Sequence, residues 1–164
     1  MKIRILLFAL LSLFLTNMLF AQSTKEDKKK AQYEQLKAMI DSKQYTFTAQ
    51  QATAQGGRTK QLTSTYTLKV HQDTLDADLP YFGRAYSATY GSDNGGIQFQ
   101  TTSFDYDAED RGDKGWTIII KPKDQSSASK MTLSLGTSGY GTLIVNSNNR
   151  QMISFYGWIS TKGK

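Results

Sequence analysis

Apolar and polar residues alternate along most of this chain, and this alternation constrains the fold more than any other feature. In residues 62–70, leucine, tyrosine and valine recur mainly at every second position against threonine and lysine. Successive side chains of a β-strand point to opposite faces, so the pattern predicts a half-buried strand. Further runs rich in β-branched and aromatic residues lie at 75–79, 97–100, 116–120, 131–135, 143–145 and 153–159.

The links between these runs are short and rich in Gly, Asn, Asp and Ser, which favour tight turns. They include residues 56–57, 92–96, 111–115, 138–139 and 146–149. Short links join antiparallel neighbours, because a parallel crossover needs about a dozen residues or more. About eight or nine strands in roughly 120 residues are too many for one flat sheet. We therefore expect a mostly β, antiparallel sandwich or curled barrel, and the pattern does not decide between the two.

One amphipathic helix is expected ahead of the strands. Four apolar residues recur at steps of one, three and four, while Lys, Glu and Gln fill most other positions: Tyr33, Leu36, Met39 and Ile40. Such a stripe is typical of a helix with one face on a core. We assign residues 22–44 to this N-terminal helix and 45–164 to the antiparallel β domain. Residues 44–61, where the helix gives way to the β domain, are polar and are expected to be rich in loops.

The first residues predict an export signal. Lys2 and Arg4 precede a largely apolar run at 5–15, and the small Ala21 follows at a suitable distance for cleavage. We expect residues 1–21 to be a signal peptide and the mature chain to begin at Gln22, with no membrane span. The alternative is an uncleaved anchor, because residues 5–21 reach the lower limit of a spanning length.

Cysteine is absent from the sequence, and this excludes several classes of protein. A disulfide scaffold, a thiol nucleophile, an iron–sulfur cluster and a cysteine-ligated zinc site all need it. A lipid anchor at the signal cut needs it too, so we expect a periplasmic or secreted protein that is not a lipoprotein. The net charge of +6 is mild and gathers toward the termini. No nucleic-acid recognition motif accompanies it, and nucleic acid is not an expected partner.

His71 is the single imidazole, which is too few for the usual catalytic zinc site. It follows the strand pattern at 62–70, so we interpret it as an exposed hairpin residue. The sequence also lacks the G-x-S-x-G pattern of a nucleophile elbow. We therefore expect no cofactor and assign no catalytic residue.

Carboxylates are concentrated in residues 105–113. A calcium loop starting at Asp107 would put Arg111 at a ligand position and Ile118 where a bidentate Glu belongs. We therefore interpret this stretch as a solvated hairpin loop. If the protein were a hydrolase, Asp105 and Asp107 would be its acid/base candidates.

The candidate ligand site is a cluster of four aromatic residues and one arginine: Tyr81, Phe82, Arg84, Tyr86 and Tyr90. Aromatic rings could stack on a sugar or apolar ligand while Arg84 binds an anion. Core packing is the alternative, because large rings stabilise a domain that has no disulfides.

Five segments of the sequence resemble an exported bacterial family of unknown function, DUF4251: residues 79–85 (LPYFGRA), 95–99, 115–118, 138–140 and 153–159. The resemblance extends over nearly all of the mature chain. It implies an exported single-domain protein and carries over no catalytic residues.

Three hypotheses for function follow from these features. The first is a non-enzymatic exported binding or envelope-associated module, whose partner is an envelope polysaccharide, lipid or protein. The second is a hydrolase that acts on envelope polymers. The third is a structural subunit that docks a partner through a strand edge or the N-terminal helix.

Overall fold

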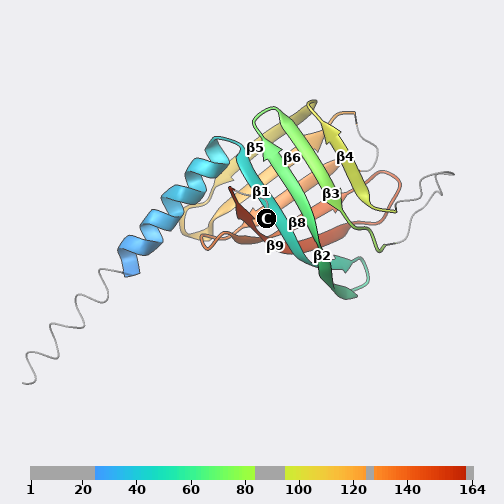
Figure 1. Ribbon diagram of the computed structural model, residues 1–164, viewed down its shortest axis with the longest axis horizontal. Coiled ribbons are helices and arrows are strands. Elements are labelled where there is room, and N and C mark those ends of the chain that lie inside the picture. Colours follow the sequence, from blue (N-terminus) through green and yellow to red (C-terminus); the bar gives the residue numbers. More distant parts are fainter. Residues whose placement is uncertain (1–24, 84–94, 125–127, 162–164) are drawn as a thin grey trace, which may run out of the picture. The chain divides into compact units, whose positions relative to one another are not determined.

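The computed structural model describes residues 25–83, 95–124 and 128–161. Within them, nine antiparallel strands form one sheet in the order β4-β3-β2-β1-β9-β8-β7-β6-β5 (Figure 1). The elements are β1 (Gln44–Ala54), β2 (Thr59–His71), β3 (Thr74–Leu79), β4 (Ile97–Thr101), β5 (Phe104–Asp110), the 3-10 helix η1 (Gly112–Lys114), β6 (Trp116–Pro122), β7 (Lys130–Leu135), β8 (Tyr140–Asn146) and β9 (Ile153–Ser160). The mostly β, antiparallel fold predicted from the alternation is confirmed.

The sheet curls into a nearly closed barrel, which resolves the choice between sandwich and barrel. Its two edge strands, β4 and β5, are consecutive in the chain and are joined by residues 102–103 alone. The backbone N–H of Lys123 donates to the carbonyl of Ser103 at 2.9 Å, and the Thr101 hydroxyl donates to the Asp124 carboxylate at 2.8 Å. The chain itself therefore runs from one edge of the sheet into the other.

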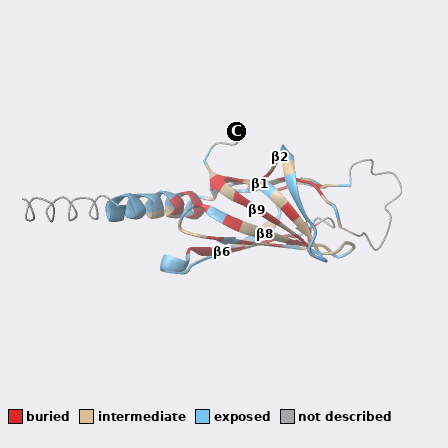
Figure 2. Cartoon of the chain, turned by 90° about the horizontal axis from the view of Figure 1, so that it is seen from below, coloured by how far each residue is buried: buried red, intermediate tan, exposed pale blue. Residues whose placement is uncertain are grey.

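Inward-facing side chains fill the barrel. In β6, Trp116, Ile118 and Ile120 are buried, whereas Thr117 and Ile119 between them are only partly covered. Figure 2 shows buried residues alternating with more exposed ones along several strands. Alternation of this kind places every second residue in the core.

Two glycines let neighbouring strands approach closely. Gly141 and Gly157 lie directly opposite each other in the β8–β9 pair. A Cβ on Gly141 would collide with the carbonyl oxygen of Ser134, and one on Gly157 with that of Thr48. Glycine in a strand commonly marks such a close approach or a bend.

The N-terminal helix spans residues 25–41. From Leu36 onward the chain belongs to the same compact unit as the strands, residues 36–164, and Leu36, Met39 and Ile40 are buried in it. Lys43, with φ of 53°, turns the chain after the helix, and Gln44 already opens β1. Within the described residues, no helix is both long and apolar enough to cross a membrane.

Two segments expected to be loops form strands instead. Most of residues 44–61 belongs to β1 and the start of β2. Phe47, Ala49 and Ala52 face the core. The alternation is hard to recognise in the sequence because two of these residues are small alanines and a bulge near Gln50 shifts the register. The acidic stretch contains β5, in which Phe104 and Tyr106 are partly covered and the carboxylates between and after them are exposed. The predicted exposure of His71, by contrast, is confirmed.

Candidate functional site

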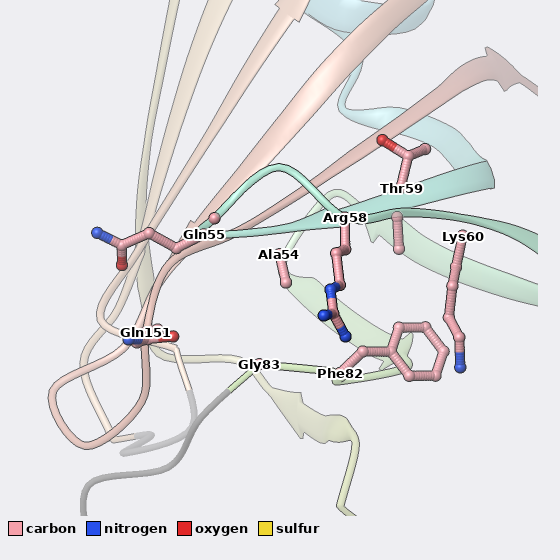
Figure 3. Close-up of a pocket in the computed structure, with 10 residues that line it drawn as sticks. Ala54, Gln55, Arg58, Thr59, Lys60, Phe82, Gly83 and Gln151 are labelled. Carbon is pink, nitrogen blue, oxygen red and sulfur yellow. The ribbon is translucent and has the colours of Figure 1, made fainter.

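An open cleft of about 830 Å³ lies between the β1–β2 hairpin and the segment that follows β3 (Figure 3). It is lined by Ala52, Ala54, Gln55, Gly56, Arg58, Thr59, Lys60, Phe82, Gly83 and Gln151. Its volume falls in the range of ligand pockets, roughly 300–1,000 Å³.

The β1–β2 hairpin supplies the basic side chains of the cleft. Gly56 and Gly57 have φ values of 110° and 83°, which favour glycine, and the Ala54 N–H donates to the Arg58 carbonyl at 3.3 Å. Register is lost between the two halves of the hairpin: Ala49 pairs with Tyr66, but Gln51 pairs with Gln61. The residues of β2 between Gln61 and Tyr66 therefore have no regular partner in β1. They lie between the barrel wall and the hairpin tip.

Phe82 provides an exposed ring on the other side of the cleft. Its relative exposure is 43%. The Lys60 ammonium lies 4.5 Å from the ring centroid, within the distance of a cation–π contact. In Figure 3 the Arg58 side chain extends toward the same segment. One aromatic ring and two cations thus converge on one space.

Tyr81 has a different role from Phe82, although the two are adjacent. Its hydroxyl donates to the carbonyl of Gln151 at 2.9 Å, and the Arg150 guanidinium lies 5.1 Å from its ring centroid. Arg150 also donates to the carbonyls of Gly95 and Gly96, at 3.1 and 3.0 Å. Tyr81 and Arg150 therefore fasten the segment before Phe82 to the loop before β9, and Phe82 remains the ring that lines the cleft.

The charge of the lining is one-sided. Arg58 and Lys60 are its charged members, and the ten residues include neither a carboxylate nor an imidazole. Within residues 25–83, 95–124 and 128–161, neither cation has a carboxylate within ion-pair distance. The polar lining is completed by the amides of Gln55 and Gln151 and by the Thr59 hydroxyl, which is hydrogen-bonded to Thr53 at 2.9 Å.

Of the aromatic cluster inferred from the sequence, Phe82 lines the cleft and Tyr81 does not. Tyr81 and Phe82 are described; Arg84, Tyr86 and Tyr90 lie outside the described residues. Phe82 is the one lining residue that was among the predicted site residues; those missed include Arg58, Lys60 and Gln151. The sequence places two basic residues, Arg58 and Lys60, just after the Gly56-Gly57 turn. Nothing in the local sequence indicates that Phe82 lies beside them.

The acidic stretch lies outside the cleft. Asp105 and Asp107 have exposed side chains on β5, and the Lys123 ammonium lies 2.7 Å from the Asp105 carboxylate. No residue of β5 lines the cleft. Among the described residues, no three His, Cys, Asp or Glu side chains are grouped so that they could hold a metal ion.

A second polar feature lies within the barrel. The hydroxyls of Tyr45 and Tyr106 are 3.4 Å apart, and Tyr106 donates to the carbonyl of Ile40 at 3.3 Å. Burial raises the pKa of Tyr45 well above the ordinary tyrosine value and also raises the pKa of Tyr106. Both phenols are therefore neutral at pH 7; Tyr45 is a buried hydrogen-bonding group and Tyr106 a partly buried one.

Comparison with known proteins supports the fold and gives the family. A crystal structure of a DUF4251 family protein from Bacteroides eggerthii DSM 20697 is similar, with a TM-score of 0.55 and 19% sequence identity over 79% of this chain and 87% of that one. At this identity the likeness shows the fold alone. Among proteins with curated descriptions, none matches this chain. The family described as "Domain of unknown function (DUF4251)" matches residues 27–159, and the chain therefore belongs to this family.

Proposed function

We propose that this protein is a non-enzymatic, exported binding module that holds its ligand in the cleft beside Phe82. One observation carries the proposal: a ring that is 43% exposed lines a cleft with two cations that have no carboxylate partner among the described residues. Concave sites that combine apolar surface with a few polar groups are where proteins bind small ligands. The predicted signal peptide supports a location in the envelope or outside the cell.

The chemistry of the lining favours binding over catalysis. General acid–base catalysis needs a group that exchanges protons, most often His, Glu or Asp. The ten lining residues contain none of these three types. The aspartates considered for a hydrolase belong to β5, outside the cleft, so they do not supply the missing groups.

Carbene footprinting of the mature chain tests this proposal. The chain from Gln22 would be labelled with and without soluble fractions of a bacterial envelope, and modification would be read residue by residue. We expect at least one fraction to protect Phe82 and Lys60. Tyr156 is the matched control, because its exposure of 44% is close to the 43% of Phe82 and it lies outside the cleft.

Two variants complete the experiment. Phe82→Ala should abolish protection of Lys60, whereas Tyr156→Ala should preserve it. Failure of every fraction to protect the cleft would overturn the proposal. Turnover of an envelope polymer that persists in Phe82→Ala would overturn it as well.

A further inference from the structure

We infer that the ligand of this cleft is an acidic saccharide, a sugar that carries a carboxylate or phosphate group. The inference rests on the proposed function and adds the chemical class of the ligand. It follows from three properties of the lining: its two cations, which have no carboxylate partner among the described residues, its exposed ring and its amide groups.

Several basic side chains of the barrel are paired with carboxylates, unlike the two cations of the cleft. Lys69 and Lys123 have carboxylates at 3.0 and 2.7 Å, and Arg111 has one at 3.3 Å. Arg58 and Lys60 are close in sequence, exposed and without such a partner in the part of the chain that the structure describes. An anion in the cleft would relieve their mutual repulsion, and a guanidinium binds carboxylate and phosphate through two parallel hydrogen bonds.

The uncharged part of the lining favours a sugar over an acyl chain. Its apolar side chains are Phe82 and two alanines, Ala52 and Ala54, which would bury little of a long hydrocarbon. An exposed ring can instead stack on the apolar face of a sugar. The amides of Gln55 and Gln151 each offer donors and an acceptor, which match sugar hydroxyls. The volume of about 830 Å³ also exceeds what a lone inorganic anion would fill.

Isothermal titration calorimetry with paired probes tests the charge requirement. The mature chain would be titrated with trigalacturonate and with its methyl ester, which has the same rings without the charge. Glucose 6-phosphate, glucose and inorganic phosphate form the second set. We expect trigalacturonate or glucose 6-phosphate to bind at least about tenfold more tightly than its neutral partner, as loss of a charge-assisted hydrogen bond implies. Inorganic phosphate alone should bind more weakly than the phosphosugar.

Single substitutions locate the binding. Arg58→Gln and Lys60→Gln should each weaken binding of the acidic probe by about tenfold and leave the neutral partner unchanged. Lys114→Gln is the matched control, because Lys114 is an exposed lysine on η1, outside the cleft. Phe82→Ala should weaken both acidic and neutral probes. Melting temperatures of the variants should match that of the parent chain, because all the substituted side chains are exposed.

The outcomes separate this inference from the proposed function. Equal affinity for acidic and neutral probes, or equal loss in Lys114→Gln, would overturn the acidic saccharide. Failure of every sugar to bind, together with protection of Phe82 by a non-saccharide envelope fraction, would overturn the ligand class and retain the binding module. If no sugar probe binds and no envelope fraction protects the cleft, both the acidic saccharide and the binding module are overturned.

Discussion

At the scale of single residues, Tyr45 and Tyr106 make the stability of the barrel sensitive to alkaline pH. Burial raises the pKa of both phenols, so the folded state favours their neutral forms. Their contribution to stability is therefore complete below the ordinary tyrosine pKa of about 10 and is lost as pH rises above it. We expect the free energy of unfolding in urea to be level between about pH 7 and pH 9 and to fall above about pH 10.

Substitution of Tyr45 by Phe removes the ionisable hydroxyl and keeps the aromatic ring, so it separates the effect of titration from the effect of packing. Tyr45→Phe should lower the free energy of unfolding at pH 7 by only about 1 kcal/mol, because Tyr106 keeps the Ile40 carbonyl as acceptor. The substitution should also reduce the loss of unfolding free energy above about pH 10. Tyr140→Phe is the control for loss of a hydroxyl from an exposed tyrosine. An identical alkaline fall in Tyr45→Phe and the parent chain would remove Tyr45 as a cause.

Gly157 is a second residue whose replacement has a definite expected cost. A methyl group there would meet the Thr48 carbonyl of β1, which cannot move without disturbing the β1–β9 pairing. Gly157→Ala should destabilise the protein by more than about 2 kcal/mol in urea unfolding. Gly95 is the control, because a Cβ at that position would have no neighbouring atom within 4 Å, and Gly95→Ala should change stability by less than about 0.5 kcal/mol. Similar effects of the two substitutions would contradict a close approach at Gly157.

At the scale of elements, β5 is an edge strand protected by its charges. Asp105, Asp107 and Glu109 are exposed along it, and exposed charges on an edge oppose pairing with a second chain. The double substitution Asp107→Val and Glu109→Val should therefore cause concentration-dependent association, measured by light scattering at pH 7. Asp78→Val, on the internal strand β3, should scatter no more light than the parent chain. Association of both variants to the same extent would show a general effect of lost charge.

Individual strands show which parts of the fold could be predicted from the sequence and which could not. Strands such as β6 and β7 were predicted because large apolar residues mark every second position. In β1 the inward positions are partly alanine and a bulge shifts the register, while in β5 an edge strand carries carboxylates that resemble a loop. Of the cleft, Phe82 was predicted from local composition. Arg58 and Lys60 were not, because their proximity to Phe82 depends on strand pairing that no local pattern records.

At the scale of the whole molecule, the N-terminal helix divides into two parts with different expected roles in stability. Residues 25–35 are mostly exposed, whereas Leu36, Met39 and Ile40 are buried in the compact unit of residues 36–164. A chain that begins at Leu36 should therefore melt within a few degrees of the chain that begins at Gln22. A chain that begins at Gln44 lacks the three buried side chains, and each is worth about 2 kcal/mol or more.

Removal of this segment also takes away the Ile40 carbonyl that accepts a hydrogen bond from the Tyr106 hydroxyl, so a partly buried polar group loses a partner in addition to the lost packing. We expect the chain from Gln44 to melt more than about 10 °C below the chain from Leu36, measured by circular dichroism. The chain from Leu36 is the matched control, since it lacks the mostly exposed residues and keeps the buried ones. Equal melting temperatures for the two shortened chains would contradict a structural role for residues 36–41. A large loss already in the chain from Leu36 would instead assign the stabilisation to residues 22–35.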